Sequence, residues 1–298
     1  MRRPFVFAWT CIVFGIILVT AACGSNAVTP PASQSEVKKD VSGGTTVAAP
    51  TTAANSPNSE TRAEPIKAEE PKKEPAAASG AKPEEEIKKT YAMNKNYDIV
   101  PKEEGVNKKV VLLTFDDGPK EAKMINGLID ALDKHKAKAI FFVNGYRVKQ
   151  HPELLKLIHD RGQIIGNHSW DHIDLKKEPN AKIDTQIKDV QRIVKETIGV
   201  APQFFRPPFG SGNDHVRQLV KEEGMLYMTW SNGSEDWVAK YQNPEGLTQR
   251  VMDQLHAGSN ILMHELPWTT EALDQLLQKL EDKGYSFVDP RAIEIPNG

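Results

Sequence analysis

The second part of the chain alternates between short apolar runs and longer segments in which apolar residues recur every three or four positions. Seven runs rich in apolar and aromatic residues predict strands: residues 110–115, 139–143, 163–167, 203–208, 225–230, 260–265 and 285–289. Five periodic segments between them predict helices: residues 124–135, 153–162, 183–199, 215–224 and 271–284. Apolar strands separated by helices indicate a parallel sheet covered on both faces, and hence an α/β barrel or a doubly wound sheet.

No such pattern precedes residue 91. Residues 24–90 consist mainly of Pro, Ala, Ser, Thr, Glu and Lys and contain no aromatic residue. A segment of this composition cannot bury a core, so we expect a disordered linker there. The folded domain is expected over residues 91–298.

The first residues have the architecture of an export signal. Met1–Arg3 is basic, Phe5–Ala22 is almost entirely apolar, and small residues precede Cys23. This pattern is similar to a lipoprotein signal peptide over residues 1–23, with Cys23 as the lipidation site. The alternative is an uncleaved membrane anchor. Both interpretations place the rest of the chain outside the cytoplasm, held at the membrane and facing the cell wall.

Charge and cysteine content narrow the function further. The formal net charge of −2 gives no reason to expect nucleic-acid binding. Cys11, the only cysteine besides Cys23, lies inside the signal, so the exported part has no pair for an internal disulfide. Its stability must come from a hydrophobic core, and we expect a monomer.

Residues with ionisable side chains follow the predicted strands. They are Asp116, Asp117, His168, Arg206, Asp236, His264 and Glu265. In both candidate architectures, active sites gather at the C-terminal ends of the strands.

Two of the histidines have chelating spacing. His168 and His172 are four residues apart, so on one helical turn their rings would share a face. Two imidazoles and one carboxylate, with a position left open for water, form a catalytic zinc set. Either Asp116 or Asp117 can supply the carboxylate, while its neighbour faces the metal-activated water. The same ligand set can hold Fe(II) in an oxygenase, and Asp-Asp-Gly-Pro alone is also a common turn.

Five segments in order carry a family resemblance. They are TFDDGP (114–119), HSWDH (168–172), RPPFG (206–210), Asp236-Trp237 and LMH (262–264). Together they resemble the motifs of the polysaccharide deacetylases of carbohydrate esterase family 4, which share the NodB-homology domain. The resemblance implies a distorted (β/α) barrel of the NodB type, preceded by the disordered tether.

The resemblance also implies a role for each motif. Asp117, His168 and His172 would hold Zn²⁺, or another divalent ion such as Co²⁺ or Ni²⁺. Asp116 would be the general base, oriented by Arg206.

The remaining implied roles concern the substrate. The backbone N–H of Phe209 would contact the oxyanion. His264 would be the general acid, oriented by Asp236, while Leu262 and Trp237 would line the pocket for the acetyl group.

Three positions depart from the family pattern. Phe209 stands where tyrosine is common, Gly233 stands three residues before Asp236 where another aspartate is often found, and Glu265 stands where Asp or Asn is usual. We assign Glu265 no role. The Gly233 change puts local support of the general acid in question, but no ligand, base or acid is missing.

The resulting hypothesis is a hydrolase that removes N-acetyl groups from N-acetylhexosamine units of an extracellular polysaccharide, most specifically N-acetylglucosamine in peptidoglycan. Chitin-like oligomers and exopolysaccharide are alternative substrates. A glycan-binding wall protein without turnover is the alternative from another class. An Fe(II) oxygenase fits less well, because the separate base and acid suit hydrolysis. Trp170, Trp268 and Tyr146 could stack on sugars or simply pack in loops.

Overall fold

The structure is a computed structural model that describes residues 87–295. The predicted signal with Cys23, and residues 24–86 of the predicted linker, lie outside the described residues. None of the helices in residues 87–295 is both long enough and apolar enough to cross a membrane.

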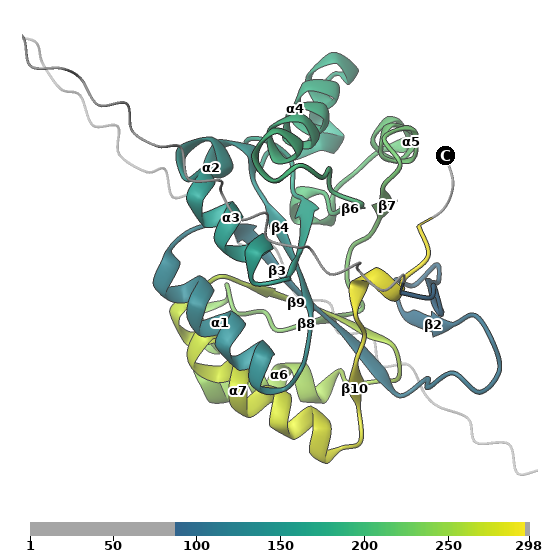
Figure 1. The fold of residues 1–298 in the computed structure, drawn as a ribbon, viewed down its shortest axis with the longest axis vertical. Helices are drawn as coiled ribbons and strands as arrows, with labels where there is room; N and C mark the ends of the chain where they lie inside the picture. The colour runs from purple at the N-terminus through teal and green to yellow at the C-terminus, as the bar shows by residue number, and fades with distance from the viewer. Residues whose placement is uncertain (1–86, 296–298) are drawn as a thin grey trace, which may run out of the picture. The chain divides into compact units, whose positions relative to one another are not determined.

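One curled parallel sheet organises the fold (Figure 1). The strands follow the order β7-β6-β5-β4-β3-β9-β8, and β10 pairs with the start of β3. Their bounds are β3 Val110–Gly118, β4 Ala139–Val143, β5 Ile164–Asn167, β6 Phe204–Phe205, β7 Leu226–Tyr227, β8 Asn232–Gly233, β9 Ser259–His264 and β10 Ser286–Phe287. The sheet forms a half-barrel, which confirms the predicted distorted (β/α) barrel.

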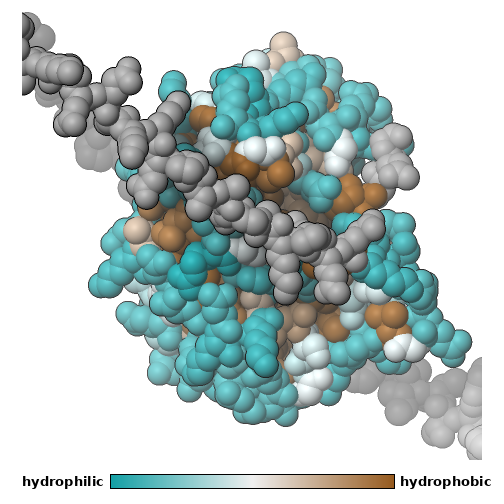
Figure 2. Space-filling model, in the orientation of Figure 1, coloured by the Kyte–Doolittle hydropathy of each residue, from teal (hydrophilic) through white to brown (hydrophobic). Residues whose placement is uncertain are grey.

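Seven α-helices flank the sheet within the described residues. They are α1 Ala122–Lys134, α2 Gly145–Gln150, α3 Pro152–Asp160, α4 Asn180–Ile198, α5 Asp214–Glu222, α6 Pro244–Asp253 and α7 Pro267–Asp282. α1 and α6 both pack against α7. In the view of Figure 2 the surface of the helices is mainly hydrophilic, with hydrophobic residues between them.

The alternation of side chains along each strand separates two cores. Val111, Leu113 and Phe115 of β3 face the helices and join the larger cluster with α1 and α7. Val110 and Leu112 face the inside of the half-barrel. Asp116 continues this inner row at the C-terminal end of the strand, where it pairs in register with His264 of β9.

A small antiparallel hairpin packs against the inner cluster. β1 (Tyr91–Met93) pairs with β2 (Ile99–Pro101), and both contribute side chains to the inner cluster. The Ile99 N–H donates to the Gly258 carbonyl just before β9. Gly258 has φ 85° and a Cβ there would overlap the Ile99 backbone, so only glycine fits this contact. The hairpin therefore closes the end of the half-barrel opposite the C-terminal ends of the strands.

Some elements differ from the prediction. The predicted strand 225–230 narrows to β7, and Asp236 follows a separate strand, β8, instead. β8 consists of the dipeptide Asn-Gly alone, and this dipeptide in a sequence normally predicts a turn. α2 and α6 were not predicted, because α2 is six residues long and α6 buries only Leu247, Thr248 and Val251.

Candidate metal centre and active site

A cavity of about 440 Å³ opens at the C-terminal ends of the strands. Its lining residues are Asp116, Asp117, His168, His172, Pro207, Phe209, Trp230, Trp237, Leu262 and His264. Arg206 and Asp236, which the sequence also singled out, are fully buried and contact Asp116 and His264 from behind. The structure thus brings together all the predicted site residues except Cys23, which lies outside the described part of the chain.

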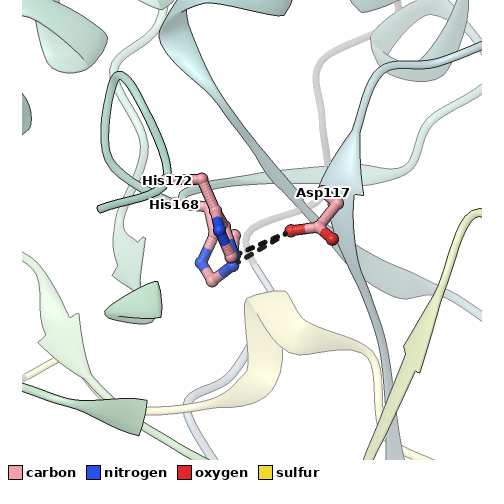
Figure 3. A group of neighbouring side chains, drawn as sticks. All are labelled: Asp117, His168 and His172. Atoms are coloured by element: carbon pink, nitrogen blue, oxygen red, sulfur yellow. Dashed lines mark ion pairs between the residues drawn. The ribbon is translucent and has the colours of Figure 1, made fainter. Parts of the chain in front are cut away.

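The three predicted metal ligands face one another across this cavity (Figure 3). Their donor atoms all lie within 4.8 Å of one another. Asp117 Oδ1 is 3.1 Å from His172 Nε2 and 3.5 Å from His168 Nε2. Two imidazole nitrogens and a carboxylate oxygen at this spacing match the donor set of a catalytic zinc site.

The expected helical turn at the two histidines is wrong. Residues 168–174 form a loop in which Ser169 (φ 65°) and His172 (φ 55°) have left-handed backbone conformations. The two rings nevertheless have centroids 5.1 Å apart. Left-handed residues are uncommon outside glycine, so this loop is a specialised conformation that the spacing alone could not reveal.

A bulge at the end of β3 explains how two consecutive aspartates serve one cavity. The register between β3 and β4 shifts between Phe115 and Gly118, and Asp117 has φ 67°. Consecutive strand residues normally face opposite sides, and a bulge re-aims a side chain. As a result Asp116 Oδ2 lies 3.7 Å from His168 Nε2, while Asp117 reaches both imidazoles.

The electrostatics of Asp117 suit a cation. Burial alone would raise its pKa, but the imidazoles of His168 and His172 outweigh burial and hold the pKa well below its usual range. Asp117 Oδ1 is buried, and among the described residues it accepts no hydrogen bond with good geometry. A buried carboxylate oxygen that faces two imidazole nitrogens and has no hydrogen-bond donor needs a positive partner. A divalent ion bound between the oxygen and the two nitrogens would meet that need.

His168 is oriented by the backbone of Arg206. Its Nδ1 lies 2.7 Å from the Arg206 carbonyl oxygen, to which it must donate. This hydrogen bond assigns the tautomer and leaves Nε2 free as a ligand atom.

The side chain of Arg206 holds Asp116. Nη1 donates to Asp116 Oδ1 at 2.7 Å and to Thr114 Oγ1 at 2.8 Å, and Nη2 donates to Asn260 Oδ1 at 3.2 Å. Nε and Nη2 also donate to the Thr229 carbonyl, and the guanidinium lies 4.4 Å over the Phe142 ring. Since its donors are satisfied, this buried cation is fixed in position.

Sequence reasoning missed Thr114 and Asn260. Both are buried polar residues that lie two and four positions before Asp116 and His264 along their strands, and this spacing of two and four on one strand face was the available signal.

Asp236 orients His264 on the other side of the cavity. His264 Nδ1 lies 2.7 Å from Asp236 Oδ1, and Oδ2 accepts from the His264 N–H and from Thr269 Oγ1, both at 2.8 Å. Burial lowers the pKa of His264, but Asp236 outweighs burial and the net shift is upward. His264 is therefore held ready to carry a proton.

The concern raised by Gly233 has a structural answer. Thr269 and Trp268, both in the first turn of α7, supply support: the Trp268 indole N–H donates to the Asp236 carbonyl at 2.8 Å. Gly233 itself is held by Gln254: the Gln254 side-chain amide nitrogen donates to the Gly233 carbonyl oxygen at 2.7 Å.

Two other aromatic candidates are also involved in packing. Trp170 covers Gly145 so closely that a Cβ there would overlap the indole ring. The guanidinium of Arg147 lies over the Tyr146 ring. These contacts favour the packing interpretation over sugar stacking for Trp170 and Tyr146.

Exposed aromatic rings rim the cavity. Phe209 is 66% exposed and lies edge-on to His172, and Trp237 is 45% exposed and lies edge-on to His264. Phe209 has φ 60°, and its backbone N–H has no acceptor among the described residues. Trp230, which sequence reasoning missed, completes the lining; a Cβ on Gly210 would lie 3.2 Å from its ring.

Known proteins are similar to this chain in sequence. The family described as polysaccharide deacetylase matches residues 103–228. The chain is 40% identical over 198 residues to the peptidoglycan-N-acetylmuramic acid deacetylase PdaC of Bacillus subtilis, covering 65% of this chain and 41% of the relative. It is 33% identical over 190 residues to a peptidoglycan-N-acetylglucosamine deacetylase of Bacillus cereus, covering 61% of this chain and 86% of the relative. The chain thus spans about two fifths of the length of the first curated relatives it matches.

Solved structures agree with this match. The structure of PdaC from Bacillus subtilis has a TM-score of 0.56 and 39% identity, covering 61% of this chain and 88% of that one. A CE4 family pseudoenzyme from Bacillus anthracis has a TM-score of 0.58 and 34% identity, covering 61% of this chain and 63% of that one. The motifs, the half-barrel and these relatives lead to one conclusion: the chain belongs to the polysaccharide deacetylase family.

Proposed function

We propose that this chain is a metal-dependent deacetylase of N-acetylhexosamine units in an extracellular polysaccharide, and that N-acetylglucosamine of peptidoglycan is its substrate. One observation carries the proposal: a carboxylate held by a buried arginine and an imidazole held by a buried aspartate line the same cavity as an Asp-His-His set. Relatives named as peptidoglycan deacetylases support the choice of polymer.

Asp117, His168 and His172 would hold the ion, Zn²⁺ or another divalent metal such as Co²⁺ or Ni²⁺. When bound, such an ion supplies a water of lowered pKa and a Lewis acid for the carbonyl.

The protein groups divide the remaining work. Asp116, aimed by its hydrogen bond from Arg206, takes the proton of the attacking water. The Phe209 N–H donates to the oxyanion that forms on the acetyl carbon. His264 then gives a proton to the amine as the carbon–nitrogen bond breaks, and Asp236 stabilises the protonated ring. The products are acetate and a free amino sugar.

Leu262, Trp230 and Trp237 belong to the apolar part of the cavity lining, which suits the acetyl methyl group and one sugar face. The exported chain would act as a monomer, tethered by a lipid on Cys23 within reach of the wall. The support for this placement is the sequence of the first 23 residues.

A second candidate function is glycan binding without turnover. It is favoured by the structural similarity to a pseudoenzyme and by Gly233. The presence of both Asp116 and His264 in working geometry favours catalysis.

Acetate release from peptidoglycan, chitin oligomers and an N-acetylated exopolysaccharide, with and without a chelator, separates these functions. We expect chelator-sensitive release that is highest on peptidoglycan and that disappears in Asp116→Asn. Glycan binding without release under any divalent metal would support the second candidate. Release that is highest on another glycan would correct the substrate.

A further inference from the structure

Glu265 is a fully buried carboxyl group without a role in the proposed reaction. It follows His264 directly, at the end of β9, and has no exposed surface. Burial raises the pKa of Glu265 to about 7, although the Lys120 N–H opposes the shift. Burying an ionisable side chain costs free energy unless its contacts compensate for the loss of water. The contacts of Glu265 therefore indicate its role in the protein.

These contacts join β9 to the loop that carries the aspartates. Glu265 Oε2 accepts a hydrogen bond from the backbone N–H of Lys120 at 2.9 Å. Glu265 Oε1 fills the space beside Gly118 so fully that a Cβ on Gly118 would overlap it. Gly118 does not have a left-handed φ, so the backbone conformation itself would accept alanine. Glycine is therefore required at residue 118 by the Glu265 side chain.

The same short segment contains the bulge that aims Asp117. Asp117 precedes Gly118 and has φ 67°, a conformation that the surroundings must hold in place. β3 and β9 pair up to Asp116 and His264, and the pairing stops there. Beyond this point Glu265 continues the connection between the two strands through its side chain.

We propose that Glu265 is a positioning residue that fixes the Asp117–Lys120 loop against β9, and thereby presets Asp117 for the metal. The inference rests on the proposed function, because it assigns Asp117 to the metal. Glu265 acts through its hydrogen bond to Lys120 and through its contact with Gly118, and it is not among the residues that line the cavity.

Two variants test the hydrogen bond in the full-length protein. In Glu265→Ala the acceptor is lost, and we expect zinc affinity to fall about 10-fold, as it does when groups behind metal ligands are removed. Glu265→Gln keeps an acceptor oxygen and should stay within about threefold of the wild type. Titration calorimetry of the metal-free protein with zinc measures both. Equal loss in the two variants, or no loss in Glu265→Ala, would overturn the proposal.

The contact with Gly118 provides a second test. Gly118→Ala should weaken zinc binding because its Cβ collides with Glu265. In the double variant Gly118→Ala/Glu265→Ala that collision is gone, so zinc affinity should equal that of Glu265→Ala alone. Losses that multiply in the double variant would show that the two residues act independently.

Amide hydrogen exchange at Lys120 separates this proposal from the proposed function, since it needs neither metal nor activity. We expect exchange at least about 10-fold faster in Glu265→Ala and close to wild type in Glu265→Gln. Leu280→Ala, a core variant in the far half of α7, is the control for general destabilisation and should leave Lys120 exchange and zinc affinity unchanged. Unchanged Lys120 exchange in Glu265→Ala refutes the positioning role even if the protein is an active deacetylase.

Discussion

Replacing Asp236 with asparagine changes one atom of the side chain but should reverse a hydrogen bond. The carboxylate accepts three hydrogen bonds, from His264 Nδ1, from the His264 N–H and from Thr269 Oγ1. An asparagine has one acceptor oxygen, which the two donors at Oδ2 will occupy. Its amide nitrogen then faces His264 Nδ1 and must donate to it. The imidazole would carry its proton on Nε2 as a neutral ring, which is a far weaker acid than imidazolium.

The size of the effect follows from the role of the acid. General acid catalysis contributes about 10²- to 10⁴-fold, so acetate release by Asp236→Asn should fall by at least about 100-fold. The pH profile should change as well. Asp236 raises the pKa of His264, so the protonated acid persists to higher pH and is lost as pH rises through that pKa. Without the carboxylate, the descending limb of residual activity should move to lower pH.

A matched pair elsewhere provides the control. His215 Nε2 lies 2.7 Å from Asp184 Oδ1, on the partly exposed surface between α4 and α5. Asp184→Asn removes the same kind of charge from a histidine and should leave the pH profile unchanged. Acetate release is measured across pH on N-acetylglucosamine oligomers for both variants. If Asp236→Asn keeps activity within about threefold and its descending limb stays in place, His264 is not the acid.

Three further predictions concern the rest of the site. Asp117→Ala should weaken zinc affinity at least about 10-fold, whereas Asp116→Ala should abolish acetate release and keep zinc affinity within about threefold. If calorimetry finds the same loss of zinc affinity in both variants, the assignment of Asp117 to the metal and Asp116 to the proton is wrong. Arg206→Met should lower the free energy of unfolding by about 3–5 kcal/mol, because it leaves Asp116 buried without its cation; a denaturant titration showing a loss below about 1 kcal/mol contradicts this. Thr269→Val should cost about 1–3 kcal/mol in the same measurement and reduce turnover, and Thr269→Ser should restore both; a turnover equal to wild type in Thr269→Val would exclude it as support for Asp236.

The sheet and the long helices were predictable because each strand is a continuous apolar run and each helix repeats apolar residues every three or four positions. Residues 110–115 and 139–143 are almost entirely apolar, as buried parallel strands require. β8 was not predictable, since Asn232-Gly233 pairs with β9 only because α6 places it there: Asn232 Nδ2 donates to the Val251 carbonyl. Tertiary contacts override the turn preference of such a short segment.

The chemistry of the site was partly visible in the sequence. Residue type and spacing indicated the carboxylates and imidazoles, but they suggested a helical turn at His168 where the chain forms a left-handed loop. Thr269 and Trp230 were not recognisable, because their roles depend on contacts with residues distant in sequence. The loop conformation at Asp117 likewise depends on β4 and Glu265, which no local pattern reveals.

The β1–β2 hairpin sets the smallest fragment that can keep this site. The region matched by the family begins at residue 103 and ends at residue 228, so it excludes the hairpin, Asp236 and His264. Cutting the chain at residue 103 would uncover the inner cluster around Leu112 and Phe142, directly below the buried guanidinium of Arg206. Water reaching that cation would screen its interaction with Asp116. The part of the chain that holds this site together is therefore larger than the region matched by the family, and shortened forms of the protein should begin before Tyr91.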